Sequence, residues 1–186
     1  IHLIMKKTVL FIALLGCISL FAQTQPTVHN PTFDKIPKSS GSDCACSGWI
    51  NKDVADQGES STKNGSDVVK FDNVESDGIY QEVAVEANSD YTLDLVYWYS
   101  EETTTTDHVE VIILKGSGYA SGYTPAYDVP ADAAQDGFGY DNLTSVDDTN
   151  NHVVRTLITP PGNTGENAMT QLTFNTRSET STAIFI

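Results

Sequence analysis

The stretch that decides the fold class is YTLDLVYWY, residues 91–99. Aromatic and aliphatic side chains occupy its odd-numbered positions, and Thr92, Asp94, Val96 and Trp98 occupy the even-numbered ones. Successive side chains of a β-strand point to opposite faces, so this period of two predicts a strand with one buried face. We therefore expect Asp94 and Trp98 to point away from the core.

Further strands are predicted on both sides of this stretch, because short apolar runs alternate with turn clusters of Gly, Pro, Asn, Asp and Ser. The runs are Val68–Phe71, Ile79–Val85, Val109–Leu114, Val153–Ile158, Leu172–Phe174 and Ala183–Ile186. No part of the expected domain shows a helical period over more than a turn or two. Many short strands predict an all-β fold, a β-sandwich (jelly roll) of two antiparallel sheets.

One long stretch interrupts this pattern. Residues 117–152 are rich in Gly, Asp and Tyr, and a loop of that length is uncommon in a compact domain unless it folds or carries function. We expect it to form a folded flap that packs through its aromatic residues, which are Tyr119, Tyr123, Tyr127, Phe138 and Tyr140. Trp49, outside the flap, is expected in the core.

The first 22 residues have the order of a signal peptide. Met5 is followed by two lysines, an apolar run over residues 9–15 and a small residue at Ala22. The run is too short for a membrane span, which needs about 20 apolar residues. We expect cleavage after Ala22 and a secreted or cell-surface product, and the alternative is a lipobox that anchors the protein through Cys17.

Residues 23–186 are long enough for one domain with its own core. The last residues read as a strand without a polar tail, so we expect the domain to be cut at its C-terminus and further domains to follow in the natural chain. The sequence has 25 acidic against 10 basic residues and a formal net charge of −15. Nucleic acid and anionic membrane surfaces are therefore excluded as partners.

Four short motifs then occur in a recognisable order. They are Asn30-Pro31-Thr32-Phe33-Asp34, Gly48-Trp49, GIYQEVAV over residues 78–85 and NSDYTL over residues 88–93. With them the chain resembles carbohydrate-binding modules of families 4, 9, 16 and 22, over most of residues 28–100 and the final strand. The resemblance implies a glycan-binding jelly roll, often with a structural calcium, at the N-terminus of a polysaccharide-degrading protein of Bacteroidetes.

The strand alternation also yields a candidate ligand-binding set. An aromatic ring stacks on the apolar face of a sugar, while carboxylates, amides and guanidinium groups hydrogen-bond to its hydroxyls. If the outward residues share one sheet, the set is Trp98, Tyr80, Glu82, Asp94, Glu110, Arg155, Gln171, Asn175 and Arg177. The alternative for Trp98 is packing beneath the flap. Because the chain is acidic, we expect a neutral glycan such as a β-glucan or xylan rather than a uronate polymer.

Metal and cysteine chemistry offer fewer signals. The resemblance implies that Asp34 is a calcium ligand, and a separate acidic loop could also supply oxygen ligands through Asp53, Asp56 and Glu59. Cys44 and Cys46 have no second pair of ligands at zinc spacing. They form a local disulfide, remain thiols, or pair with a segment beyond Ile186.

No catalytic motif is present: neither Gly-x-Ser-x-Gly nor His-Glu-x-x-His occurs. We therefore expect a non-catalytic carbohydrate-binding module that holds an exported protein on its polysaccharide. Two alternatives stay open. One is a structural or adhesive β-sandwich domain of a cell-surface protein, and the other is a small glycan-active enzyme.

Overall fold

The computed structural model describes residues 25–36, 45, 47–51, 54–72, 75–99, 106–124, 138–160 and 168–186. Its strands are β1 (Asp56–Gln57), β2 (Glu59–Lys63), β3 (Ser66–Lys70), β4 (Asp77–Gly78), β5 (Tyr80–Ala84), β6 (Asp90–Tyr97), β7 (Val109–Lys115), β8 (His152–Ile158), β9 (Ala168–Asn175) and β10 (Ser181–Phe185). Its helical turns are η1 (Gly116–Gly118), α1 (Leu143–Asp147) and η2 (Thr149–Asn151).

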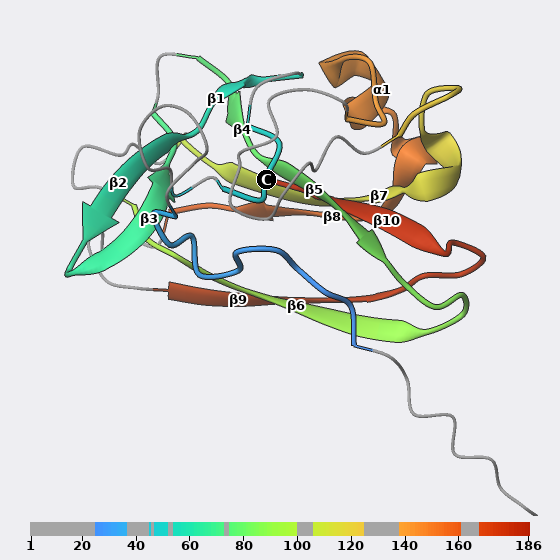
Figure 1. The fold of residues 1–186 in the computed structure, drawn as a ribbon, viewed down its shortest axis with the longest axis horizontal. Helices are drawn as coiled ribbons and strands as arrows, with labels where there is room; N and C mark the ends of the chain where they lie inside the picture. The colour runs from blue at the N-terminus through green and yellow to red at the C-terminus, as the bar shows by residue number, and fades with distance from the viewer. Residues whose placement is uncertain are drawn as a thin grey trace, which may run out of the picture.

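Antiparallel pairing dominates the described part of the chain (Figure 1). A four-stranded sheet has the order β5-β10-β7-β8, and β6 pairs with β9 along its whole length. β2 and β3 form a hairpin, whereas β1 and β4 form a short parallel pair. The prediction of a mostly β chain with antiparallel sheets is confirmed. Every predicted strand is found, and β2 and the β1–β4 pair are additional.

The four-stranded sheet and the β6–β9 pair share one hydrophobic cluster. Val111 and Ile113 of β7 are buried in it, and Leu93 of β6 and Phe174 of β9 pack against them from the other side. Along β6 the odd-numbered residues are buried or half-buried and the even-numbered ones are exposed. The alternation predicted for this strand is therefore confirmed. Trp49, 3% exposed, belongs to the same cluster, as predicted.

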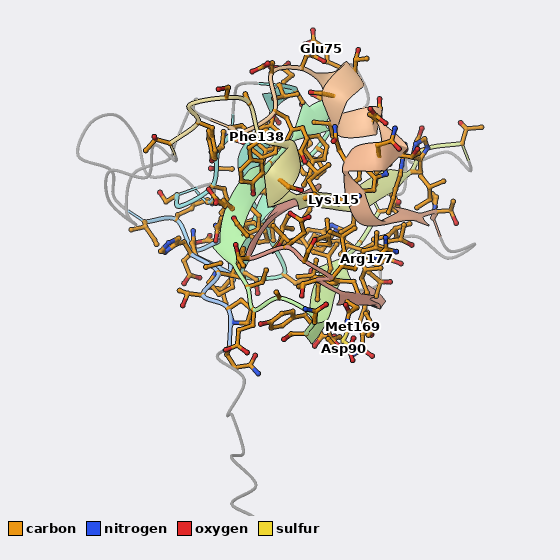
Figure 2. The ribbon with its side chains drawn as sticks, turned by 90° about the vertical axis from the view of Figure 1, so that its right-hand side faces the viewer. Glu75, Asp90, Lys115, Phe138, Met169 and Arg177 are labelled. Atoms are coloured by element: carbon orange, nitrogen blue, oxygen red, sulfur yellow. The ribbon has the colours of Figure 1, made fainter. Side chains whose placement is uncertain are left out.

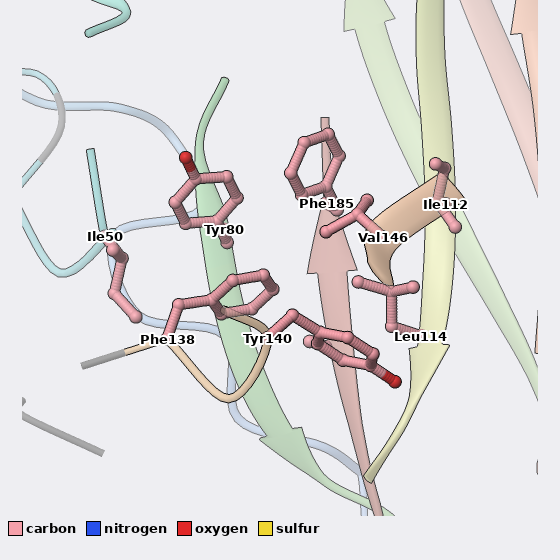
Figure 3. Packing of buried hydrophobic residues seen from close by; sticks show 9 residues of the cluster. Ile50, Tyr80, Ile112, Leu114, Phe138, Tyr140, Val146 and Phe185 are labelled. Atoms are coloured by element: carbon pink, nitrogen blue, oxygen red, sulfur yellow. The ribbon is translucent and has the colours of Figure 1, made fainter. Parts of the chain in front are cut away.

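A second cluster covers the opposite face of the four-stranded sheet, which we call its outer face (Figure 3). Its buried members are Ile50, Tyr80, Ile112, Leu114, Phe138, Tyr140, Val146, Ala183 and Phe185. Phe138 and Tyr140 come from the Tyr-rich stretch and Val146 comes from α1. The predicted flap is confirmed for the described part of that stretch, because it packs on the sheet as a further layer. As a result β7 is buried on both faces.

The prediction that Tyr80 points outward is wrong. Tyr80 is 0% exposed, and its ring stacks on Phe138 with 4.4 Å between ring centroids and on Phe185 with 4.9 Å. Its hydroxyl accepts hydrogen bonds from the backbone N–H groups of Val54 (3.1 Å) and Ala55 (2.7 Å). The alternation of β5 holds, but the face that would otherwise meet solvent is covered by the flap.

Local turn chemistry shapes the connections. Asn64 and Gly65 both have positive φ, 51° and 84°, in the two-residue turn between β2 and β3, and Asn-Gly is a favoured pair for that conformation. Thr176 ties the turn after β5 to the turn after β9. Its buried hydroxyl donates to the Glu86 carbonyl oxygen (2.6 Å) and accepts from the Ser89 N–H (3.0 Å).

Several predictions fall outside the described residues. They are the signal peptide with Cys17, the state of Cys44 and Cys46, and the positions of Asp53 and Tyr127. Among the helices that the structure does describe, none has the length and apolar character needed to cross a bilayer.

Candidate functional site

The exposed side of the β6–β9 pair carries a regular array of side chains, which we call the ladder face. Its members alternate with the buried residues of the same strands and stand opposite one another in the antiparallel register. The cross-strand pairs are Asp90 with Asn175, Thr92 with Thr173, Asp94 with Gln171, and Val96 with Met169. Three of the four pairs are polar, and the fourth is aliphatic.

Hydrogen bonds between strands orient the polar pairs. Gln171 Nε2 donates to Asp94 Oδ1 (2.8 Å), and Asn175 Nδ2 donates to Asp90 Oδ1 (2.7 Å). The hydroxyls of the threonine pair between them lie 3.3 Å apart. All six side chains remain exposed. The ladder face therefore presents carboxylates, amides and hydroxyls whose rotamers are already restricted.

The ladder face ends in an apolar patch next to Trp98. Val96 is 59% exposed and Met169 is 70% exposed. Trp98 follows the last residue of β6 and is half-buried, and the Lys63 Nζ of β2 lies 6.0 Å from its ring centroid. A cation at that distance interacts favourably with the indole face. The Trp98 side chain is thus partly exposed, and Lys63 lies close to its ring.

Arg177 lies just beyond the other end of the ladder face. It has a positive φ of 52° in the turn after β9, and its backbone N–H donates to Asn175 Oδ1 (2.9 Å). Its side chain is exposed. The turn therefore helps to orient the terminal amide of the ladder face.

The predicted ligand-binding residues do not share one sheet. Asp94, Gln171 and Asn175 lie on the ladder face, whereas Glu110 and Arg155 lie on β7 and β8 of the four-stranded sheet. Figure 2, which looks along the strands, has Asp90 and Met169 at the lower surface and Glu75, beside the cleft described next, at the upper surface. The structure thus divides the set between opposite sides of the molecule.

Glu82 joins neither exposed group. It lies on β5 next to the covered face of the sheet, where it is half-buried and accepts a hydrogen bond from the Ser181 hydroxyl. Burial raises the pKa of Tyr119 in the flap, and the charge of Glu82 contributes to the same shift. The flap thus takes Glu82, like Tyr80, out of the open surface that the sequence predicts for it.

Glu110 and Arg155 border a cleft of about 480 Å³ on the outer face of the four-stranded sheet. Arg155 Nη2 donates to Glu110 Oε2, and its Nη1 lies 3.6 Å from Asp147 Oδ1 of α1. His108 Nε2 lies 3.5 Å from Glu110 Oε1. The hydrogen bond and charge of Glu110 raise the pKa of Arg155. The guanidinium group is therefore largely engaged by carboxylates of its own chain.

Carboxylates crowd the far side of the same cleft. A hydrogen bond with Asp56 and repulsion from its charge raise the pKa of Glu75. Burial, and then the charges of neighbouring carboxylates, raises the pKa of Asp77, although the Asp72 N–H donates to it (2.6 Å). Repulsion between carboxylates therefore contributes to both raised pKa values, although burial is the larger cause for Asp77 and the hydrogen bond with Asp56 is the larger cause for Glu75.

Metal binding gains no support from the described residues. No group of three or more His, Cys, Asp or Glu side chains is placed there to hold a metal ion. Asp34 is exposed and accepts a hydrogen bond from the Thr32 hydroxyl (2.9 Å), and its backbone N–H donates to the Asn30 side chain. Calcium at Asp34 stays an expectation from the resemblance.

The predicted ligand-binding set includes three of the eight residues of the ladder face and omits the other five. Asp90, Thr92, Val96, Met169 and Thr173 stand beside the predicted residues, and the period-two pattern alone would have placed them on the same strand faces. What the sequence pattern does not give is the pairing of β6 with β9. Residues that lie opposite each other in this pair are more than 70 positions apart in the sequence. Comparisons of the chain with protein-family models, curated proteins and solved structures found no match.

Proposed function

We propose that this chain is a non-catalytic carbohydrate-binding domain, exported from the cell, that contacts its glycan through the ladder face. The layers described above are consistent with a jelly-roll β-sandwich, the architecture that the resembling modules imply. The observation that carries the proposal is the row of exposed, cross-strand polar pairs that ends in the exposed apolar pair of Met169 and Val96, which is two residues before Trp98 along the chain.

The chemistry of this face suits a sugar chain. Sugar hydroxyls both donate and accept hydrogen bonds, and the ladder face offers acceptors on Asp94 and donors on Gln171 within 2.8 Å of each other. Val96 and Met169 can pack against apolar C–H groups of a sugar ring. Since side chains on one face recur every second residue, the four pairs extend over about 20 Å. A face of that length suits an extended chain of several sugar units.

Charge narrows the class of glycan. The whole chain has a formal net charge of −15, and the ladder face itself carries Asp90 and Asp94 without a basic residue among its members. A uronate polymer would meet repulsion from both sources. Neutral polysaccharides such as β-glucans or xylans are therefore the proposed ligands. A structural calcium remains an expectation from the resemblance.

Affinity electrophoresis tests the proposal with a matched pair of carboxylate substitutions. Asp94→Ala removes an acceptor from the ladder face, and Asp147→Ala removes an exposed carboxylate from the opposite side of the molecule. Hydrogen bonds that involve a charged group contribute about 1.5 to 3 kcal/mol, so Asp94→Ala should weaken retardation about tenfold or more. Asp147→Ala should be retarded like the unmodified protein.

Two results would overturn the proposal. One is a folded protein that no neutral polysaccharide in the gel retards. The other is the reverse pattern, in which Asp147→Ala loses retardation while Asp94→Ala keeps it, because binding would then belong to the cleft. Polygalacturonate in a parallel gel should cause no retardation, since it is a uronate polymer.

A further inference from the structure

The cleft on the outer face of the four-stranded sheet is separate from the ladder face and has the dimensions of a small-molecule site. Its volume is about 480 Å³, within the range of roughly 300 to 1,000 Å³ typical of ligand pockets. One wall contains Ala55 and residues 75–77 around the β1–β4 pair, and the other contains α1. Figure 1 shows the β1–β4 pair at the upper left and α1 at the upper right, both above the four-stranded sheet.

The floor of the cleft is apolar. Ile112 of β7, Phe185 of β10 and Val146 of α1 line it, and all three are buried members of the outer cluster. Phe71 and Leu143 add further apolar surface at its walls, and Leu143 is 37% exposed. Ile112, Val146 and Phe185 are each 7% exposed or less, so a ligand with a hydrocarbon or ring body would remove apolar surface from water mainly at Phe71 and Leu143.

The rim of the cleft has a strong excess of negative charge. Among the lining residues that the structure describes, the carboxylates are Asp72, Glu75, Asp77, Asp107, Glu110 and Asp147. Among the same lining residues the cationic side chain is Arg155, which Glu110 and Asp147 engage, and the imidazole of His108 lies beside Glu110. The rim therefore attracts a cation and repels an anion.

The close spacing of these carboxylates also favours a cation as the ligand. Contact with Asp56 raises the pKa of Glu75, and burial followed by neighbouring carboxylates raises the pKa of Asp77. A cation placed between such groups relieves the repulsion that they exert on each other. A ligand that complements this cleft therefore has a positive charge, which the carboxylates attract, and an apolar body, which the apolar lining accepts.

We propose that this cleft binds a small organic cation, whose ammonium or guanidinium group meets the carboxylate rim and whose apolar body packs against Phe71 and Leu143 of the walls. This activity is independent of the glycan-binding role of the ladder face, because the two sites lie on opposite sides of the molecule. An inorganic cation does not fit as well, since the described carboxylates form no metal-ligand cluster.

Three probes of nearly equal size isolate the contribution of charge. Phenethylamine carries the cation, 2-phenylethanol is neutral, and phenylacetate is the anion, so the apolar body is almost constant. Isothermal titration calorimetry should give an affinity for phenethylamine about tenfold above that for 2-phenylethanol, which corresponds to about 1.4 kcal/mol. Phenylacetate should not bind. Equal affinity for the amine and the alcohol would refute the role of the rim, and failure of the folded protein to bind the amine would refute the site.

Substitutions locate the binding in the cleft. Glu75→Gln, which keeps the size of the side chain, should weaken phenethylamine binding about threefold, as expected for one exposed charge. Asp94→Asn removes the same charge from the ladder face and should leave the affinity unchanged. Equal loss in both variants would mean that the amine responds to overall charge alone and would overturn the proposal. Because each variant is compared by calorimetry and by its melting temperature, a folding defect is distinguished from lost binding.

Discussion

Replacement of Tyr80 by Phe removes one buried hydroxyl and keeps the ring that stacks on Phe138 and Phe185. The hydroxyl accepts two hydrogen bonds, from the backbone N–H groups of Val54 and Ala55. It thereby fastens residues 54–55 to the outer face of the four-stranded sheet. Phe cannot accept either bond, so both backbone donors lose this partner within the packed layer.

The expected loss in the free energy of unfolding follows from the two hydrogen bonds that are removed. Each intramolecular hydrogen bond contributes about 0.5 to 1.5 kcal/mol net, and a buried donor left unsatisfied costs about 1 to 3 kcal/mol. Two partly buried donors therefore predict a loss of about 2 kcal/mol in the free energy of unfolding. For a domain of this size, 1 kcal/mol shifts the melting temperature by about 2 to 4 °C, so the variant should melt about 4 to 8 °C lower.

Thermal and urea unfolding followed by circular dichroism measure this loss. Tyr91→Phe is the matched control, because the Tyr91 side chain is also buried but its hydroxyl accepts one backbone hydrogen bond, from the Glu86 N–H (3.0 Å). The free energy of unfolding should fall about half as much in Tyr91→Phe as in Tyr80→Phe. A Tyr80→Phe protein as stable as the unmodified chain would refute the burial of this hydroxyl, and would favour the outward orientation that β5 alternation alone predicts.

Two further predictions concern stability. Thr176→Val keeps the side-chain shape but removes the buried hydroxyl that links the Glu86 carbonyl to the Ser89 N–H, so urea unfolding should show a loss of about 1 to 3 kcal/mol. The pKa of Glu75 is raised above its ordinary value of 4.5, chiefly by the hydrogen bond with Asp56, so ionised Glu75 destabilises the fold at neutral pH and this effect disappears as pH falls through the raised pKa. Glu75→Gln should therefore raise the melting temperature at pH 7, with a gain that shrinks towards about pH 4; a constant gain across that range would contradict the assignment.

The strands could be predicted from sequence because their pattern is local. In β6 one face meets a hydrophobic cluster and the other meets solvent, so side-chain polarity reports orientation directly. The same rule placed Asp94, Gln171 and Asn175 on exposed strand faces, where the structure has them. Their meeting on one surface depends on the antiparallel register of β6 with β9, and a single strand does not contain that information.

The prediction failed where a third layer covers the sheet. In β5 the alternation of Tyr80 and Glu82 with Val83 has the same period as in β6, but residues of the flap pack on the outer face. An aromatic residue with a polar tip is compatible with either environment, because its hydroxyl can bond to water or to buried backbone groups. Only the position of Phe138, more than 50 residues away in sequence, decides between them.

A titration followed by nuclear magnetic resonance distinguishes the ladder face from the cleft as the surface that contacts the glycan. An isotope-labelled protein would be titrated with a neutral oligosaccharide from the polysaccharide that retards it most. The amide signals of Thr92, Asp94, Gln171 and Thr173 should shift, while that of Glu110 in the cleft should stay in place. Shifts confined to the cleft, or a spectrum unchanged at saturating oligosaccharide, would contradict glycan binding by the ladder face.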